Sequence, residues 1–267
     1  KMKPSNQPIW ATKGKMEIDM LEVDNLMVFF ENALALNGLS MHVSKGEIVG
    51  VIGSNSAGKT TLMNALSGLI IDMRIKEKRK GGQRITTYGK VIFNGEEITQ
   101  YTPRERVQRG IVLSRERHPI FPESSVTENF KIAGYLRSKS EIREVMTYAF
   151  SLFPNLKDLQ KRKAGFLSGG EQQMLAIGMA LTVKPTLLLL DEPLLGLSPM
   201  MQQVVMDAII DLNNTWGITV VLSEQFARPV LPVIDRGYVV ENGMLTLTGT
   251  GAELMNNPEI KAAYFGV

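Results

Sequence analysis

Residues 53–61 read Gly53-Ser54-Asn55-Ser56-Ala57-Gly58-Lys59-Thr60-Thr61 and fit the pattern G-x-x-x-x-G-K-[ST] of a phosphate-binding loop. Residues 47–52 precede the loop and form an apolar, β-branched run that predicts a buried strand. Residues 60–66 carry apolar side chains at helical spacing and predict a helix. Strand, loop and helix in this order are the context that the motif requires, so a glycine-rich turn that matches by chance is the weaker interpretation.

The chemistry of this loop predicts a nucleotide ligand. Glycines allow the backbone N–H groups to turn inward around a β-phosphate, and the N-terminus of the following helix adds the positive end of its dipole. We expect Lys59 to reach the β- and γ-phosphates and the Thr60 hydroxyl to ligate Mg²⁺. The expected ligands are therefore ATP or a similar nucleotide, together with Mg²⁺.

The composition restricts the class of protein. The chain of 267 residues contains no cysteine, which excludes disulfides, thiolate metal sites and cysteine nucleophiles. A net charge of +3 is too small to indicate a nucleic-acid partner, and we expect none. The sequence has neither an apolar run of eighteen residues nor the apolar core of a signal peptide. These features predict a soluble, cytosolic protein.

Residues 1–20 are expected to be a tail outside the fold, either disordered or carried over from expression, and residues 21–267 to be the folded domain. Short alternating segments within 21–43 predict antiparallel strands. Of the pair Phe29-Phe30, one ring is expected in the core, and the other could stack on a base. The charged run at 74–84 predicts an exposed loop, for which contact with anionic lipid headgroups is the less favoured alternative to simple solvation.

The segment from about 102 to 164 has helical periodicity and little strand character, which interrupts the alternation of strands and helices that phosphate-loop folds show. We therefore expect an inserted helical subdomain at 102–164. Alternation resumes beyond it, with predicted helices at 171–181, 200–213 and 226–233, predicted strands at 186–190, 218–222 and 238–240, and a helical piece at 252–264 that Pro258 breaks.

Two acidic residues follow the apolar run Leu187–Leu190. A parallel strand that ends in Asp191-Glu192 places both carboxylates at the sheet edge where ligands of such folds bind. We expect Asp191 to hold Mg²⁺ and Glu192 to polarise the water that attacks the γ-phosphate. Two acids after a strand are often only a polar loop, but a phosphate loop in the same chain favours the catalytic interpretation.

The segment Leu167-Ser168-Gly169-Gly170-Glu171-Gln172-Gln173 contains a capping box, in which Ser168 and Glu171 open a helix. The capping box does not account for the adjacent pair Gly169-Gly170. Two glycines at a helix N-terminus let an anion approach the backbone closely. A chain that binds one nucleotide has no evident use for this second phosphate site, whereas two chains facing head-to-tail do.

Taken together, 53–61, 167–173 and 191–192 resemble the phosphate loop, signature and acidic strand end of ABC transporter ATPase subunits, in the same order. The resemblance implies an α/β fold, a P-loop NTPase (RecA-like) core with an antiparallel β subdomain and an inserted α-helical subdomain. The segment 196–199 (GLSP) is similar to the D-loop of that family. Further segments resemble the second ATPase subunit of branched-chain amino acid importers: 110–122, 126–129, 223–225, 235–243 and 263–266.

The resemblance also implies roles for single residues. Phe30 would stack on adenine, and Phe29 would be the core residue. Ser168, Gly169, Gly170 and Glu171 would contact the nucleotide of a partner chain. Two positions depart from the general family pattern: Glu116 stands where a glutamine is usual near Mg²⁺, and Gln225 stands where a switch histidine is usual. Both departures are familiar in the second-subunit subfamily.

The implied function is ATP hydrolysis that powers a separate integral membrane permease, at the cytoplasmic face of the cell membrane. The implied partners are permease subunits, a second ATPase subunit that is non-identical, and indirectly a periplasmic or extracellular solute-binding protein. Alternatives are an importer ATPase for another solute such as urea, or a soluble ABC-type ATPase in translation or repair. A GTP-dependent switch is disfavoured, since no Asn-Lys-x-Asp segment is found.

Overall fold

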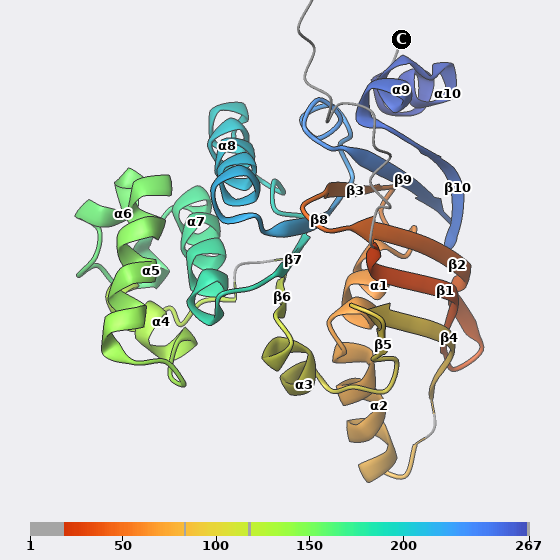
Figure 1. The fold of residues 1–267 in the computed structure, drawn as a ribbon, viewed down its shortest axis with the longest axis horizontal. Coiled ribbons are helices and arrows are strands. Elements are labelled where there is room, and N and C mark those ends of the chain that lie inside the picture. Colours follow the sequence, from red (N-terminus) through yellow and green to blue (C-terminus); the bar gives the residue numbers. More distant parts are fainter. Residues whose placement is uncertain (1–18, 83, 117–118, 266–267) are drawn as a thin grey trace, which may run out of the picture.

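The computed structural model describes residues 19–82, 84–116 and 119–265. A six-stranded sheet in the order β10-β9-β3-β8-β7-β6 forms its centre (Figure 1). Strands β3, β6, β7, β8 and β9 are parallel, and β10 is antiparallel to β9. Every residue of β3, β7 and β8 is buried, as expected for parallel strands covered on both faces. The bounds are β3 Ile48–Ile52, β6 Ile111–Ser114, β7 Leu187–Asp191, β8 Thr219–Glu224, β9 Arg236–Glu241 and β10 Met244–Gly249.

A second, antiparallel sheet has the order β2-β1-β4-β5. Its strands are β1 Asp19–Phe30, β2 Ala33–Ser44, β4 Ile85–Phe93 and β5 Glu96–Glu97. Asn94 and Gly95 join the last two strands with φ angles of 49° and 79°, the left-handed pair that a tight hairpin requires. Helix α1 (Lys59–Leu66) lies between the two sheets, where Leu62 and Leu66 pack with residues of both (Figure 1). The antiparallel β subdomain expected from the sequence is therefore present.

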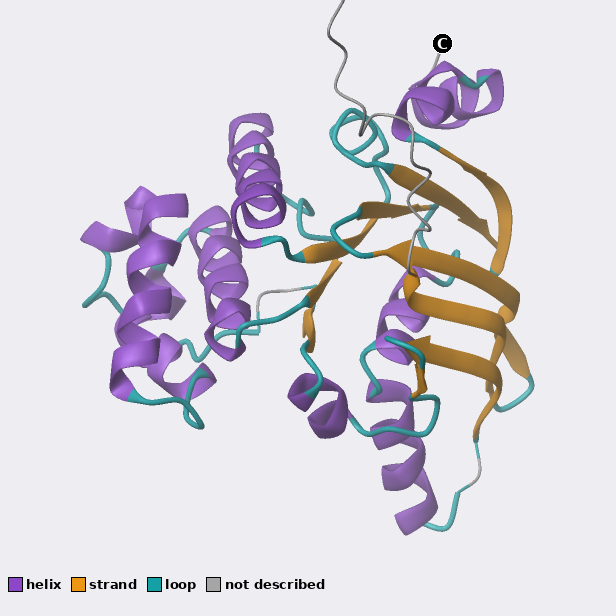
Figure 2. Cartoon of the chain, viewed as in Figure 1, coloured by secondary structure: helices purple, strands orange, loops and turns teal. Residues whose placement is uncertain are grey.

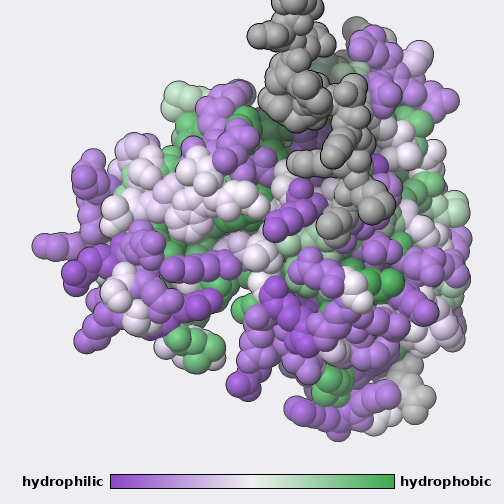
Figure 3. All heavy atoms as spheres, in the orientation of Figure 1, coloured by the Kyte–Doolittle hydropathy of each residue, from purple (hydrophilic) through white to green (hydrophobic). Residues whose placement is uncertain are grey.

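A block of helices covers the side of the six-stranded sheet that faces away from α1 (Figure 2). The block contains α4 Val126–Ala133, α5 Lys139–Leu152, α6 Pro154–Asp158 and α7 Gly169–Ala180, and α8 Pro199–Trp216 lies beside it. Serines 125, 138 and 168 cap α4, α5 and α7, and each forms a reciprocal capping box with a glutamate three residues later. One continuous core joins Phe130 and Val145 of the block to Leu188 and Val220 of the sheet. The side of the molecule that Figure 3 shows is mostly hydrophilic on its surface.

The expectation of an exposed loop at 74–84 was wrong for most of that run. Residues Leu69–Arg79 form helix α2, and only the residues after Arg79 leave the helix. Its charges are spaced for a helix: Lys76 Nζ lies 2.9 Å from Asp72 Oδ2, an i,i+4 pair. Arg74 ties the helix to β4, because its Nη1 donates to the Thr87 hydroxyl at 3.2 Å.

Other elements also differ from expectation. The segment 226–233 was predicted to be a helix but consists of turns; its two prolines lack the N–H groups that a helix requires. The segment 102–164, expected to have little strand character, begins with α3 Pro103–Gln108 and then β6, the edge strand of the central sheet. Strand β10 was not foreseen. The C-terminal helical piece is α9 Gly251–Asn256, α10 Pro258–Ile260 and a π-helix at Lys261–Phe265, with the expected break before Pro258.

Of the predicted tail, Asp19 and Met20 begin strand β1, and residues 1–18 lie outside the described part of the chain. Within the described part, no helix is both long enough and apolar enough to cross a membrane.

Candidate active site

The phosphate loop joins the C-terminal end of β3 to α1, as the sequence predicts. Two of its glycines are required by close packing. A Cβ atom at Gly53 would collide with the carbonyl oxygen of Val240, and one at Gly58 would lie 2.8 Å from the carbonyl oxygen of Ala35. Gly58 also has a φ of +107°, which L side chains rarely adopt. The loop is therefore held against β9 and β2 by contacts that only glycine permits.

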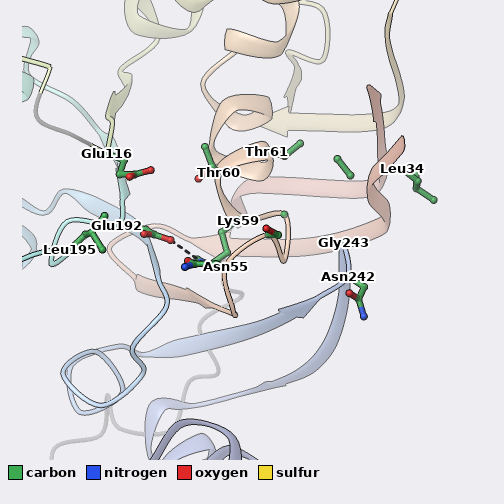
Figure 4. Close-up of a pocket in the computed structure, with 13 residues that line it drawn as sticks. Leu34, Asn55, Lys59, Thr60, Thr61, Glu116, Glu192, Leu195, Asn242 and Gly243 are labelled. Atoms are coloured by element: carbon green, nitrogen blue, oxygen red, sulfur yellow. Dashed lines mark ion pairs between the residues drawn. The ribbon is translucent and has the colours of Figure 1, made fainter. Parts of the chain in front are cut away.

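The Lys59 ammonium group is buried at the floor of the site and has three acceptors (Figure 4). Nζ donates to the carbonyl oxygens of Gly53 and Ser54, both at 2.9 Å, and lies 3.1 Å from Glu192 Oε1. An ammonium group has three N–H donors, so this arrangement uses all of them. A phosphate that reaches Lys59 must compete with the Glu192 carboxylate.

Asp191 lies at the end of β7, where the sequence predicted an acid. Its Oδ1 accepts hydrogen bonds from the hydroxyls of Ser223, at 2.7 Å, and Thr60, at 3.3 Å. Burial raises the pKa of Asp191, and the nearby carboxylates of Glu192 and Glu116 raise it further. The desolvated carboxylate beside other acids indicates a place where a cation is favourable.

These oxygens fit Mg²⁺ held together with a nucleotide. Magnesium prefers hard oxygen ligands and is usually bound by one or two carboxylates plus substrate phosphates and water. Asp191 and Thr60 supply such oxygens from two elements, and Glu116 lines the cavity beside Thr60 (Figure 4). No cluster of three or more His, Cys, Asp or Glu side chains placed to hold a metal occurs within the residues described.

Glu192 follows Asp191 with a φ of +47°, in the left-handed region. This conformation costs about 1–2 kcal/mol for a residue with a Cβ atom. The Glu192 N–H donates to the carbonyl oxygen of Ser223 at 3.1 Å and to its hydroxyl at 3.2 Å. Two residues later, the N–H of Leu194 donates to Glu224 Oε1 at 2.7 Å. Hydrogen bonds from the end of β8 thus fix the strained turn.

Sequence reasoning gave Ser223 and Glu224 no role, although both lie at the edge of the site. The signal was available: they directly follow the predicted strand 218–222, and parallel strands bring their carboxyl ends to one edge of the sheet. The pairing of β7 with β8 places Ser223 directly opposite Asp191.

A cavity of about 660 Å³ opens over the loop. The loop, α1, Glu116 and Glu192 line one part of it, and the rest is lined by Leu34 and Ala35 of β2, Leu195, and the Asn242-Gly243 turn (Figure 4). Phe30 is not among the described lining residues. Its ring is half-buried and packs against the core between the two sheets. The expectation that Phe29 is the core residue was wrong: its half-buried ring contacts Tyr88 edge-on, with the ring centroids 6.1 Å apart. Stacking of adenine on Phe30 stays a prediction.

The segment Ser168–Glu171 does not contribute to this cavity among the residues described. Ser168 caps α7, and its N–H donates to Glu171 Oε2 at 2.7 Å. A Cβ atom at Gly169 would meet nothing within 4 Å, so its backbone faces open space, whereas Gly170 packs against Met201 of α8. Gln225, directly after β8, is half-buried and also absent from the described lining. The role predicted for Ser168–Glu171 needs a second chain, and both this role and the one predicted for Gln225 stay predictions.

Comparison with known proteins agrees with this geometry. The family model described as ABC transporter matches residues 36–195. The chain is 38% identical to the high-affinity branched-chain amino acid transport ATP-binding protein BraG of Pseudomonas aeruginosa, over 92% of this chain and 100% of that protein. It is 33% identical to the probable branched-chain amino acid transport ATP-binding protein LivF of Archaeoglobus fulgidus, over 93% and 99%. The crystal structure of the ADP conformation of an ATP-binding cassette of an ABC transporter superposes with a TM-score of 0.75 at 28% identity, covering 93% of this chain and 99% of that one.

Proposed function

This chain belongs to the ABC transporter family as an ATP-binding, ATP-hydrolysing subunit, and on that basis we propose that it powers a separate membrane permease for branched-chain amino acids. One observation carries the catalytic part of the proposal. The site brings Lys59, Thr60, Asp191 and Glu192 together from two segments 131 residues apart, with Thr60 bonded to Asp191 and Lys59 paired with Glu192.

Binding of ATP would use the phosphate loop and its lysine. Backbone N–H groups of residues 54–60 would surround the β-phosphate, at the positive end of α1. Lys59 would exchange its contact with Glu192 for the β- and γ-phosphate oxygens, which carry more charge. Thr60 and Asp191 would hold Mg²⁺, with Glu116 beside them, and the metal supplies charge neutralisation at the phosphates.

Hydrolysis would then depend on Glu192. Once Lys59 contacts phosphate, the Glu192 carboxylate is free to accept a hydrogen bond from the attacking water and to polarise it. A positioned base of this kind contributes about 10²–10⁴-fold to rate. Gln225 would donate a hydrogen bond near the γ-phosphate from the end of β8.

We also propose that two ATPase subunits face each other head-to-tail. The open backbone at Gly169, together with the Ser168 cap, would then contact the nucleotide held by the phosphate loop of the partner. The permease subunits would contact the helical block and the Glu116 loop, so that closure of the ATPase pair shifts the conformation of the permease. The chain would accordingly be peripheral, at the cytoplasmic face of the membrane, and a solute-binding protein outside would supply the solute.

The identity of the solute is inferred from the names of the relatives. Transport of another solute, such as urea, and a soluble role without a permease remain the alternative functions. Co-purification of the tagged chain with a permease distinguishes transport from a soluble role. ATPase assays of the complex in lipid, with binding protein and either leucine or urea, then distinguish the solutes. We expect leucine, and not urea, to stimulate hydrolysis.

The Lys59→Ala variant should abolish that stimulation and most ATP binding, measured by calorimetry, while leaving the fold intact. Recovery of the chain without any membrane protein would contradict the transport function.

A further inference from the structure

A buried carboxyl group lies beside the active site without lining its cavity. Glu224 is 2% exposed and ends β8, which is hydrogen-bonded between β7 and β3 in the middle of the sheet (Figure 1). The cavity over the phosphate loop is lined by Glu192 and Glu116, but Glu224 is not among its described lining residues. Burial of a carboxyl group is unfavourable unless its oxygens are hydrogen-bonded, so its contacts indicate what it does.

Glu224 contacts both halves of the site. Its side-chain Oε1 accepts the N–H of Leu194 at 2.7 Å, two residues beyond Glu192. Its backbone carbonyl oxygen accepts the N–H of Gly53, the first residue of the phosphate loop, at 3.2 Å. A single residue therefore connects the turn that follows β7 to the loop that holds the phosphates.

The turn that Glu224 holds is the one that aims Glu192. Glu192 has the unfavourable φ of +47°, and the Leu195 N–H closes the turn onto the Glu192 carbonyl oxygen at 3.2 Å. Such a conformation persists only when its surroundings fix it. Ser223 fixes the turn from its beginning, through the Glu192 N–H. The bond from Leu194 to Glu224 fixes it from the far side of Glu192.

We propose that Glu224 is a positioning residue for ATP hydrolysis: it holds the Glu192–Leu195 turn and thereby orients the Glu192 carboxylate over the phosphate loop. This inference rests on the proposed role of Glu192 as the group that polarises water. It assigns Glu224 no contact with ATP, Mg²⁺ or water, so its loss should reduce turnover and leave ATP binding almost unchanged.

A glutamine can replace Glu224 in this role. Burial raises the pKa of Glu224 to about 8, and the Glu192 carboxylate adds to the shift, so the neutral acid predominates at pH 7. Glutamine matches the neutral acid in size and keeps one oxygen that can accept the Leu194 N–H. Leucine has a similar volume but no acceptor, and it leaves that N–H without its partner.

The test compares Glu224→Leu and Glu224→Gln in the full-length chain, with Thr219→Val as the matched control. Thr219 is fully buried at the opposite end of β8, where its Oγ1 accepts the Gly46 N–H at 2.8 Å. The control thus removes a comparable side-chain acceptor from the same strand, away from the site. Small misplacements of catalytic groups can cost about 10²-fold in rate, so we expect Glu224→Leu to lower kcat by about 10–100-fold. Its KM for ATP should stay within about twofold of the parent, because the interaction is absent from substrate binding.

The glutamine and valine variants should keep kcat within about threefold of the parent. Amide hydrogen exchange at Leu194 should accelerate in Glu224→Leu and stay protected in the other two. Equal losses of kcat in Glu224→Leu and Thr219→Val would indicate a merely structural role and overturn the proposal. So would a loss of more than about tenfold in Glu224→Gln, a result that stays informative even if the leucine variant does not fold.

Combination with Glu192→Gln separates this proposal from the one it rests on. If Glu224 acts through Glu192, adding Glu224→Leu to Glu192→Gln should lower the residual rate by less than about twofold. A further loss as large as in the parent background would overturn the positioning role. If Glu192→Gln alone hydrolyses ATP at the parental rate, the role of Glu192 fails instead, and accelerated exchange at Leu194 would still establish the contact.

Discussion

The C-terminal ends of β7 and β8 bring together carboxyl groups in different environments. Asp191 and Glu224 are buried, and burial raises the pKa of both, whereas Glu192 lines the cavity and pairs with Lys59. Carboxyl groups in different surroundings commonly have separate roles. Here Asp191 is suited to bind a metal, and Glu224 is suited to accept a hydrogen bond that holds the turn. Glu192, which pairs with Lys59, is suited to accept a proton.

We expect Glu192→Gln to bind ATP and to hydrolyse it about 10²–10⁴-fold more slowly, because glutamine keeps the size of glutamate but cannot accept a proton. The ion pair at 3.1 Å adds a second expectation. Without the competing carboxylate, Lys59 should be more available to phosphate, so ATP affinity should stay equal or increase. Single-turnover hydrolysis and calorimetric titration measure the two effects. Parental turnover would show that Glu192 is not the base.

The buried Glu224 also predicts how stability depends on pH. Its folded-state pKa of about 8 lies above the ordinary value of 4.5, so the folded state binds this proton more tightly than the unfolded state. Its contribution to stability is therefore complete below about pH 4.5 and is lost as the pH rises toward 8. Between pH 5 and 8, the stability of the parent relative to Glu224→Gln should fall by up to about 1.4 kcal/mol per pH unit. Urea titrations at several pH values measure this difference, and a constant or rising difference would contradict it.

At the scale of elements, α1 is anchored at both ends. Its N-terminus carries the phosphate loop, and its C-terminal carbonyls of Ala65 and Leu66 each accept a hydrogen bond from Arg106 Nη1 at 2.7 Å. Arg106 is 1% exposed and also donates to the carbonyls of Ile98, Thr99 and Tyr101. Within the described part of the chain, no acid is paired with it. The cation instead lies against the negative end of the helix dipole.

Replacement of Arg106 by methionine should therefore lower the free energy of unfolding by about 2–4 kcal/mol, because several buried carbonyls lose their donor. Arg109 of the same segment is the matched control, since its ion pair with Glu96 is partly exposed and such pairs contribute little. Chemical denaturation should show a large loss for Arg106→Met and a much smaller one for Arg109→Met. Equal losses would mean that the buried contacts contribute no more than the surface pair.

Elements with a strong local signal were predictable, and those that depend on tertiary context were not. The strands around the loop and the acids are uniformly apolar, and α7 opens with a capping box, so sequence alone placed them. Helix α2 was mistaken for a loop because its run of charges hides a short amphipathic pattern, in which Ile70 and Ile71 are buried. The short strand β6 was missed within the helical block because its four residues carry no period of their own.

At the scale of the whole molecule, the site on one chain is only half of the one that the sequence predicts. Lys59, Thr60, Asp191 and Glu192 lie beside one another, because a phosphate loop and an acidic strand end meet at the same sheet edge. The wall formed by Leu34, Ala35 and the Asn242-Gly243 turn was not predictable, since it depends on how the antiparallel sheet packs on the central one. Residues 168–171 are not among the described residues that line this cavity, so the contacts predicted for them require another subunit.

Glu116 and Gln225 indicate which kind of subunit that is. Glu116 lines the cavity, and after burial and Glu192 it adds to the raised pKa of Asp191, so it brings negative charge to the place where an anionic nucleotide binds. Gln225 can donate a hydrogen bond but cannot carry the positive charge of a histidine, and charged hydrogen bonds are roughly twice as strong as neutral ones. In the roles predicted for them, both residues would weaken the attraction of this site for the γ-phosphate. We therefore expect only a weak homodimer, and a working pair with a non-identical subunit that carries glutamine and histidine at these positions.

The double variant Glu116→Gln, Gln225→His tests this expectation in the chain itself. Removing one negative charge and allowing one positive charge should strengthen ATP-dependent self-association and raise the basal ATPase rate of the isolated chain by about tenfold or more, since each charge-assisted contact contributes about 1.5–3 kcal/mol. The parent chain should be largely monomeric without ATP, and its hydrolysis should rise when the partner subunit and permease are added. Light scattering and steady-state ATPase assays, with Lys59→Ala as the inactive control, measure both. Cooperative, rapid hydrolysis by the parent chain alone would contradict the heteromeric pairing while leaving the membership of the ATPase family unaffected.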